Sequence, residues 1–138
     1  MHEYSAAGEY TVTLRADDGK DISEAASKTI KVTNVYIAPT QKGMYYAGTS
    51  NKWSHEAMEY DSTTGEWFIA LTLTGEGDNN GAQRFKVTST PDWKGTVWGD
   101  AGSNKLCSNQ ATCKDVNVDK KGNYVLRVND KSLTWSIK

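Results

Sequence analysis

The 138-residue chain lacks several features that mark common classes of protein. It has two prolines, two cysteines and a net charge of -1, and no apolar run approaches the roughly 18 residues that cross a bilayer. The near-neutral charge leaves no electrostatic case for nucleic acid or an anionic membrane, because both need a clustered positive surface. Few prolines and only twelve glycines also argue against a low-complexity linker. We therefore expect no nucleic-acid partner and no membrane insertion.

The two cysteines, Cys107 and Cys113, bear on the compartment of the protein. A Cys₂His₂ metal site would also need His2 and His55, which lie far apart in the sequence, and a CxxC redox pair would need tighter spacing. A disulfide and two free thiols remain, and the polar loop between the cysteines favours the disulfide, which implies an extracytoplasmic compartment. We expect an extracellular protein, or one exported and attached to the outer cell surface. Because no apolar signal-peptide core follows Met1, an exported chain of this sequence would be a mature piece or an excised part of the natural protein.

Alternating apolar residues predict strands along the whole chain, and no segment has apolar residues at helical spacing over a useful length. In one such run Trp67, Ile69, Leu71 and Leu73 are large and apolar, so they should share one face of a strand and pack in a core. Short strands about ten residues apart indicate a β-sandwich or a β-barrel. We expect strands at Glu9–Leu14, Lys28–Val32, Met44–Gly48, Glu66–Leu73, Arg84–Ser89, Asp115–Val118, Tyr124–Val128 and Leu133–Ile137.

The segment Val32–Gly43 separates two parts of the chain. Pro39 is excluded from a central strand, and the Thr-Gln-Lys-Gly that follows it favours a turn. About 95 residues remain after the segment, enough for a seven- or eight-stranded sandwich, whereas the part before it is too short to bury a useful core. We therefore expect an N-terminal fragment with its linker at residues 1–38 and a β-sandwich domain at residues 39–138.

Residues 2–32 carry two strand motifs with a turn at Asp17-Asp18-Gly19 between them. The first reads H-x-Y-x-x-x-G-x-Y-x-V-x-L, and the closing strand carries Thr, Ile and Val. This segment resembles the C-terminal third of a PKD (polycystic-kidney-disease repeat) domain, without the first two thirds. Such domains are spacers in exported proteins, so the resemblance implies a two-stranded PKD-like fragment. The matching residues are His2, Tyr4, Gly8, Tyr10, Val12, Leu14, Thr29, Ile30 and Val32.

Residues 44–138 carry a second ordered set of motifs. A strand is followed by G-x-x-x-x-W, a short apolar step, W-x-x-x-x-x-L, a strand similar to F-K-F, and a tryptophan in the next loop. In order and spacing the segment resembles starch- and glycogen-binding β-sandwich modules, such as those of bacterial outer-membrane starch-binding lipoproteins. The resemblance implies an all-β, immunoglobulin-like antiparallel β-sandwich. The matching residues are Gly48, Trp53, Met58, Trp67, Leu73, Phe85-Lys86-Val87, Trp93, Trp98-Gly99-Asp100 and Gly122-Asn123-Tyr124.

The same resemblance implies a ligand and a site. In those modules two loop aromatics clamp an α-glucan, and a strand lysine between them reaches a sugar hydroxyl, which implies Trp53, Lys86 and Trp93 here. The expected ligand is an α-1,4-glucan (starch, glycogen or malto-oligosaccharides), with chitin or another exported polysaccharide as the alternative. Residues 75–83 are longer than the equivalent segment of those modules, and they either cover the groove or extend it.

The chemistry of sugars supports tryptophans in polar loops without the resemblance. A pyranose has a face of C–H groups that an aromatic ring buries, and a rim of hydroxyls that polar side chains satisfy. An exposed ring without a partner is unfavourable, so Trp53 and Trp93 either contact a ligand or fold back as a lid on the end of the sandwich. Lys86 alternates with apolar neighbours and points away from the core, where it either binds a ligand or is solvated.

Four further residues are candidates for the site, each with a second interpretation. Trp98 is either a third ring platform or a core residue of an edge strand. Asn51, Asp92 and Asp100 are either partners of sugar hydroxyls or turn formers, which is the commoner role of Asn and Asp in loops.

No catalytic arrangement is visible in the sequence. A glycosidase needs two carboxyls at a defined separation in a walled cleft, whereas Glu56, Glu59, Asp61 and Glu66 sit in turns. A Ser-His-Asp set, a metal-ligand cluster and a phosphate-binding glycine loop are also missing. We therefore expect a protein that is not an enzyme and uses no metal or cofactor. Its partner is a polysaccharide or oligosaccharide; alternatively, it is a protein-binding or adhesive spacer without affinity for glycans.

The N-terminal fragment presents an apolar face that a two-stranded hairpin cannot bury alone. The hairpin can pack on the sandwich of its own chain, or it can pair with the same hairpin of a second chain through an open edge. Because the Pro39-bearing linker does not force the first arrangement, we expect a dimer through the N-terminal strands at high concentration. The face consists of Tyr10, Val12, Leu14, Ile30 and Val32.

Overall fold

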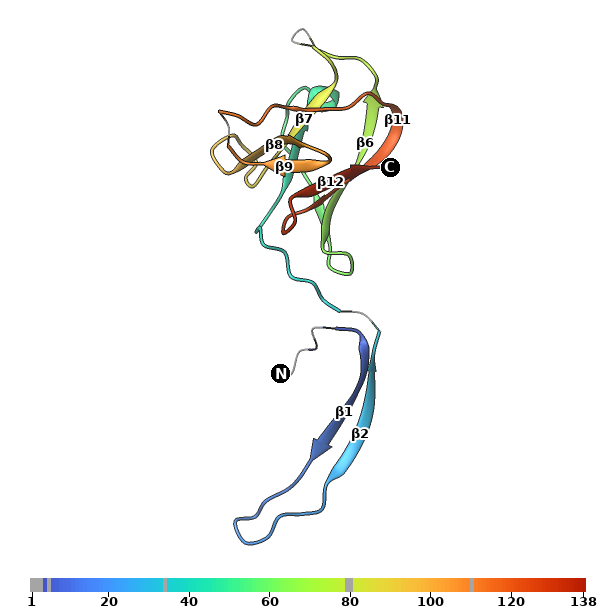
Figure 1. Cartoon of the computed structure of the whole chain (residues 1–138), viewed down its shortest axis with the longest axis vertical. Coiled ribbons are helices and arrows are strands. Elements are labelled where there is room, and N and C mark those ends of the chain that lie inside the picture. Colours follow the sequence, from blue (N-terminus) through green and yellow to red (C-terminus); the bar gives the residue numbers. More distant parts are fainter. Residues whose placement is uncertain (1–3, 5, 34, 79–80, 110) are drawn as a thin grey trace. The chain divides into compact units, whose positions relative to one another are not determined.

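The computed structural model describes residues 4, 6–33, 35–78, 81–109 and 111–138. The chain divides into two compact units, Met1–Ile37 and Ala38–Lys138, and the described residues place two strands in the first and ten in the second (Figure 1). In the part of the chain that is described, no helix is long and apolar enough to cross a membrane. His2, considered above as a metal ligand, lies outside the described residues.

The first unit is an antiparallel β-hairpin of β1 (Gly8–Leu14) and β2 (Ala26–Val32). Tyr10 lies opposite Ile30, and Val12 lies opposite Lys28. Directly opposite residues point to the same face of a sheet, so the expected apolar residues share one face of the hairpin, with Lys28 among them. Val12 and Leu14 are 43% and 72% exposed.

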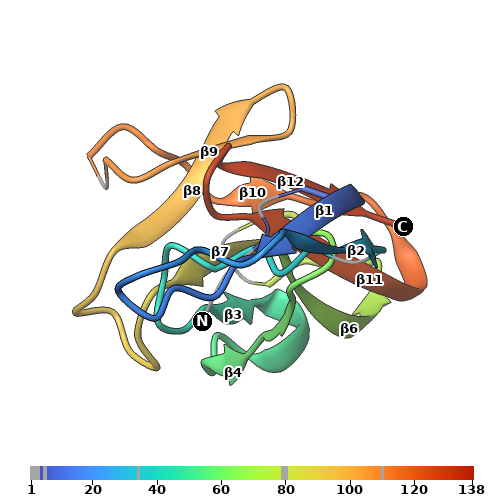
Figure 2. The ribbon, with the colours of Figure 1, turned by 90° about the horizontal axis from the view of Figure 1, so that it is seen from below.

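The second unit is an antiparallel sheet of ten strands with one short 3₁₀ helix (Figures 1 and 2). In chain order the elements are β3 (Tyr45–Gly48), η1 (Thr49–Asn51), β4 (Glu56–Ala57), β5 (Glu59–Asp61), β6 (Glu66–Thr74), β7 (Arg84–Thr88), β8 (Val97–Gly102), β9 (Lys105–Cys107), β10 (Val116–Asn117), β11 (Lys121–Asn129) and β12 (Thr134–Ile137).

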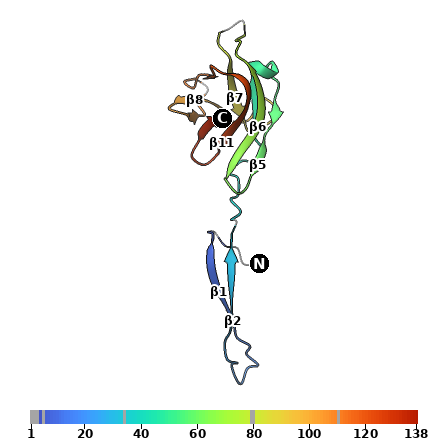
Figure 3. The same ribbon diagram turned by 90° about the vertical axis from the view of Figure 1, so that its right-hand side faces the viewer.

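The sheet of the second unit folds back on itself into a nearly closed, barrel-like sandwich. Its strand order is β4-β3-β7-β8-β9-β12-β11-β6-β5, with β10 paired to β7, and β5, β6 and β11 lie side by side in Figure 3. The two terminal strands of this order, β4 and β5, are separated in the sequence only by Met58, so the ends of the sheet are covalently joined. The predicted all-β antiparallel sandwich is confirmed, and the arrangement is consistent with an immunoglobulin-like fold.

The core lies between the two faces of this sandwich. On β6 the side chains at positions 67, 69, 71 and 73 are buried, as the alternation predicts. Trp135 of β12 packs edge-on against Phe85 of β7, with ring centroids 5.7 Å apart. The buried cluster consists of Met44, Tyr46, Met58, Trp67, Ile69, Leu71, Leu73, Phe85, Val87, Trp98, Leu106, Val116, Val118, Leu126 and Val128.

A buried carboxylate ties the start of the second unit to this core. Oδ2 of Asp130, in the β11–β12 turn, accepts hydrogen bonds from the backbone amides of Thr40 and Gln41 at 2.7 and 2.9 Å and from Nε1 of Trp67 at 3.2 Å. Burial raises the pKa of Asp130, but the hydrogen bonds from Gln41, Trp67 and Thr40 together hold this pKa below its usual value. Asp130 is therefore a charged anchor that joins the segment before β3 to the β11–β12 turn.

The predicted disulfide between Cys107 and Cys113 is present. It joins the end of β9 to the segment that leads into β10. Next to it, the amide of Asp100 donates to the carbonyl of Lys114 at 2.7 Å. The disulfide and this bridge hold the residues that lead into β10 beside β8.

Candidate functional site

Trp53 lies in a tight turn that follows β3. Lys52 and Trp53 both have left-handed backbone conformations, with φ of 55° and 62°, and the amide of Trp53 donates to the carbonyl of Gly48 at 2.8 Å. The side chain of Asn51 closes the same turn, because it accepts from the amide of Gly48 at 2.9 Å and donates to the carbonyl of Ser54 at 2.6 Å. Asn51 is therefore a turn former here.

Trp93 lies in the loop between β7 and β8 and is 46% exposed. The loop is shaped by Asp92, whose Oδ1 accepts from the hydroxyl of Thr90 at 2.7 Å and from the amide of Lys94 at 3.0 Å. These two hydrogen bonds hold the pKa of Asp92 below its usual value, because they favour the ionised carboxylate. Asp92 therefore fixes the shape of the loop that carries Trp93, and its carboxylate is hydrogen-bonded within that loop.

The two loop tryptophans lie next to each other across β7. The end of β3 lies beside the start of β7, with Gly48 opposite Phe85, and Trp93 follows the other end of β7. The ring centroids of Trp53 and Trp93 are 6.2 Å apart, and the ring planes are inclined by 46°. The ring of His55 packs edge-on against Trp93 at 4.5 Å. The structure thus sets two tilted rings side by side at the surface.

Lys86 projects from β7 beside these rings. Its neighbours Phe85 and Val87 are buried, so Lys86 lies on the outward face of the strand, as predicted. Its Nζ is 3.5 Å from Oδ1 of Asp115. The two rings and this ion pair border an open hollow of about 340 Å³, called the aromatic hollow below. It is lined by Trp53, Lys86, Trp93, Val97 and Asp115.

The rim of the aromatic hollow is held by a chain of charged side chains. Nε1 of Trp53 donates to Oδ2 of Asp78 at 2.9 Å, and the guanidinium of Arg84 donates to both carboxylate oxygens of Asp78 at 2.9 and 3.1 Å. The same guanidinium pairs with Asp115 at 2.9 Å and lies 5.4 Å from the centroid of the Trp53 ring. Trp53 is therefore fixed through its edge by Asp78 and through its face by Arg84.

Asp78 belongs to residues 75–83, the segment that we expected either to cover the groove or to extend it. Its contact with Trp53 places this part of the segment beside the aromatic hollow. Asn79 and Asn80, in the same segment, lie outside the described residues.

Two of the remaining candidates lie outside the hollow. Trp98 is 4% exposed and stands opposite the fully buried Val87, so its ring faces the core. The interpretation of Trp98 as a third ring platform for a ligand is therefore wrong, because the pleat of β8 turns this side chain inward. Asp100 accepts from the amide of Gly102 at 2.9 Å within β8, where the pairing with β9 shifts register. Neither residue lines the aromatic hollow.

The sequence did not identify four residues that line or surround the aromatic hollow: Asp115, His55, Asp78 and Arg84. A signal existed for Asp115, because the apolar positions of the strand predicted at residues 115–118 are Val116 and Val118, which leaves Asp115 on the outward face. No local pattern connects Asp78 with Trp53, which is 25 residues away in the chain.

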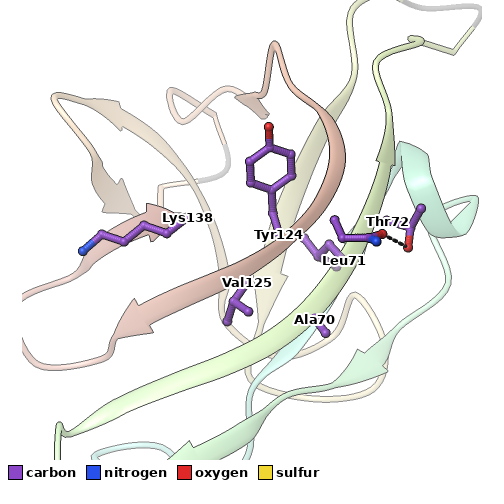
Figure 4. A pocket seen from close by; sticks show the side chains of 7 residues that line it. Ala70, Leu71, Thr72, Tyr124, Val125 and Lys138 are labelled. Atoms are coloured by element: carbon purple, nitrogen blue, oxygen red, sulfur yellow. Dashed lines mark hydrogen bonds between the residues drawn. The ribbon is translucent and has the colours of Figure 1, made fainter.

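A different hollow, of about 280 Å³, lies over β6 and β11 (Figure 4). The hydroxyl of Thr72 donates to Oδ1 of Asn123 at 3.0 Å across the two strands, and Tyr124 is the aromatic residue of the lining. Ala70, Leu71, Val125 and Lys138 complete the lining. Because this surface presents one ring and no ion pair among its described residues, it is a poorer match to a sugar than the aromatic hollow.

Comparison of the chain with protein families, curated proteins and solved structures found no significant match. Among the described residues, no group of three or more His, Cys, Asp or Glu side chains is placed to hold a metal ion.

Proposed function

We propose that this protein binds polysaccharide without catalysis, through the aromatic hollow. The observation that carries the proposal is the pair of tilted tryptophan rings beside the Lys86–Asp115 ion pair. The rings offer apolar faces to the C–H surface of a sugar. Lys86 donates and Asp115 accepts, so the two together can satisfy the hydroxyl rim, which both donates and accepts hydrogen bonds.

The preferred ligand in this proposal is an α-1,4-glucan such as starch, glycogen or a malto-oligosaccharide. Such a chain curves, so consecutive sugars turn their faces in different directions. Rings inclined by 46° suit a curved chain, whereas a flat row of sugars as in crystalline cellulose or chitin favours coplanar rings. The resemblance to starch-binding modules points to the same ligand class.

Binding without hydrolysis is favoured by the carboxylates around the hollow. Hydrolysis of a glycosidic bond uses two carboxyls on either side of the bond. Among the described lining residues Asp115 is the one carboxylate, and its two oxygens are paired with Arg84 and Lys86. Within the described lining Asp115 therefore lacks the second carboxyl that hydrolysis uses, and both of its oxygens are already engaged in ion pairs.

An exported location fits the same proposal. The Cys107–Cys113 disulfide is typical of proteins that work outside the reducing cytoplasm. Polysaccharides such as starch are also met outside the cell, so we place the protein in the extracellular space or on the outer cell surface.

The test is a titration of the intrinsic tryptophan fluorescence with maltoheptaose, chitohexaose and cellohexaose. Trp93→Ala is the informative variant, because Trp93 is half-exposed and has an ordinary backbone conformation, whereas Trp53 is held at a φ of 62°. We expect Trp93→Ala to weaken maltoheptaose binding by about 1–3 kcal/mol, the scale of one aromatic face removed from water.

Tyr36→Ala is the matched control, since it removes a 72% exposed aromatic residue that does not line the hollow. Pull-down on insoluble starch, chitin and cellulose decides the ligand class. Retention on chitin alone would overturn the assignment to α-glucan. If the protein binds no glycan at all, it is instead a spacer or a protein-binding domain.

A further inference from the structure

A further hollow, of about 350 Å³, adjoins the aromatic hollow and is called the polar hollow below. It is lined by Arg84, Lys114, Asp115 and Asn117. Asp115 lines both hollows, so the two surfaces meet at this carboxylate.

Arg84 on β7 and Asn117 on β10, two residues of the polar hollow, share the outward face of these strands, and Asp115 directly precedes β10. In the register of these strands Val116 lies opposite Phe85, and Asn117 lies opposite Arg84. Val116 and Phe85 are both 1% exposed, so they face the core and their neighbours in the sequence face outward. Arg84 and Lys86 on β7 therefore stand beside Asn117 and Asp115, which forms a continuous polar strip next to the two rings.

Residues 113–117, which form the side of this strip next to β7, are held in place by a disulfide, a backbone hydrogen bond and strand pairing. Cys113 is bonded to Cys107, the carbonyl of Lys114 accepts from the amide of Asp100 at 2.7 Å, and β10 pairs with β7. Asp115 is further held by Arg84 at 2.9 Å. A surface that is ordered before binding loses less entropy when a ligand arrives, which favours recognition.

The chemistry of the polar hollow differs from that of its neighbour. Its described lining has no aromatic ring, but it offers the ammonium of Lys114, the amide of Asn117 and the carboxylate of Asp115. Lys114 and Asn117 are exposed, and their side chains make no ion pair or hydrogen bond within the described residues. These are groups that donate to and accept from hydroxyls at the rim of a sugar, without a platform for its C–H face.

We propose that the polar hollow is a second sugar subsite, which takes further residues of an oligosaccharide whose first residues lie on the Trp53 and Trp93 rings. The inference rests on the proposed function, because it extends the same binding surface past Asp115. It predicts a dependence on chain length: a short oligosaccharide held by the rings does not reach Lys114 and Asn117, and a longer one does.

The experiment is calorimetric titration of the whole chain with maltotriose and with maltoheptaose. The variant is Lys114→Ala combined with Asn117→Ala, and Lys131→Ala is the control, because Lys131 is equally exposed in the β11–β12 turn. We expect the double variant to bind maltoheptaose on the order of tenfold more weakly, as for the loss of one or two hydrogen bonds, and to bind maltotriose within about twofold of the unmodified chain. The control should bind both sugars as the unmodified chain does.

The outcomes separate the subsite from the function on which it rests. Equal weakening for both sugars, or no weakening for either, would overturn the second subsite and leave the proposed function intact, since the unmodified chain would still bind both. If the unmodified chain binds neither sugar, the proposed function itself fails and the subsite fails with it. The melting temperature of the double variant should match that of the unmodified chain, because both substituted side chains are exposed.

Discussion

The core of the sandwich and the aromatic hollow use the same residue type for opposite purposes. Trp67 and Trp98 are 6% and 4% exposed, whereas Trp93 is 46% exposed. Trp67 and Trp98 sit on strands, where side chains point alternately to opposite faces. Trp53 and Trp93 sit in loops whose shape is fixed by hydrogen bonds within the turns. The contrast shows that the backbone setting of a tryptophan, and not its hydrophobicity, decides whether its ring is buried in the core or lies at the surface.

The largest expected effect is on stability. Trp67→Ala should lower the free energy of unfolding by about 3–5 kcal/mol, because it leaves a cavity in the core and removes a hydrogen bond to Asp130. Trp93→Ala should lower it by less than about 1 kcal/mol, since a half-exposed loop ring fills no cavity. Urea denaturation followed by far-ultraviolet circular dichroism measures both. Equal losses would mean that Trp93 is part of the core, and the contrast would fail.

The second expected effect concerns Asp130 and acid. Its folded-state pKa lies below the usual value, so its stabilising contribution is fully present above the unfolded pKa of about 4 and disappears as the pH falls through the folded pKa. Asp130→Ala should lose about 1–3 kcal/mol at pH 7, because it leaves the buried indole N–H of Trp67 and two partly buried amides without an acceptor. Thermal melting of both proteins between pH 7 and pH 2 measures the effect. The difference between them should shrink in acid, and a constant difference would show that the carboxylate charge is not involved.

The third effect concerns the support of Trp53. Asp78→Ala removes the acceptor of its indole N–H and one partner of Arg84, so the ring loses its fixed orientation. Binding of maltoheptaose should weaken by on the order of 1 kcal/mol, with little change in melting temperature. Asp78→Asn should be milder, because an amide oxygen still accepts the indole N–H. Asp119→Ala, at an exposed site, is the control; unchanged binding by Asp78→Ala would show that Trp53 needs no such support.

The smallest expected effect is self-association through the hairpin of the first unit, and it depends on protein concentration. The apolar face of this hairpin includes exposed residues, whereas the core of the sandwich is buried. We expect light scattering to show a rising apparent mass with protein concentration, through pairing of exposed hairpin edges. Leu14→Lys, at a 72% exposed position, should suppress this rise. A strict monomer whose Tyr10–Leu14 amides are protected from hydrogen exchange would exclude pairing between chains.

Local patterns predicted the longer elements of the fold well. Strands β6, β7 and β11 follow from alternation, and the disulfide follows from two cysteines flanking a polar loop. Patterns did not predict β4, β5, β8 and β9, because these strands are short or contain glycine and so carry too few alternating residues to be recognised.

The sequence by itself determined which residues face inward along each long strand and that Lys86 faces outward, because side-chain alternation is a local property, whereas it left open whether Trp53 and Trp93 fold back onto the sandwich. Only the tertiary structure decided that Trp98 points inward, that Asp78 supports Trp53, and that Asp115 joins the two rings to the polar hollow. Those contacts depend on strand order and register, which bring together residues that are distant in the chain. Neither order nor register is encoded in any short segment.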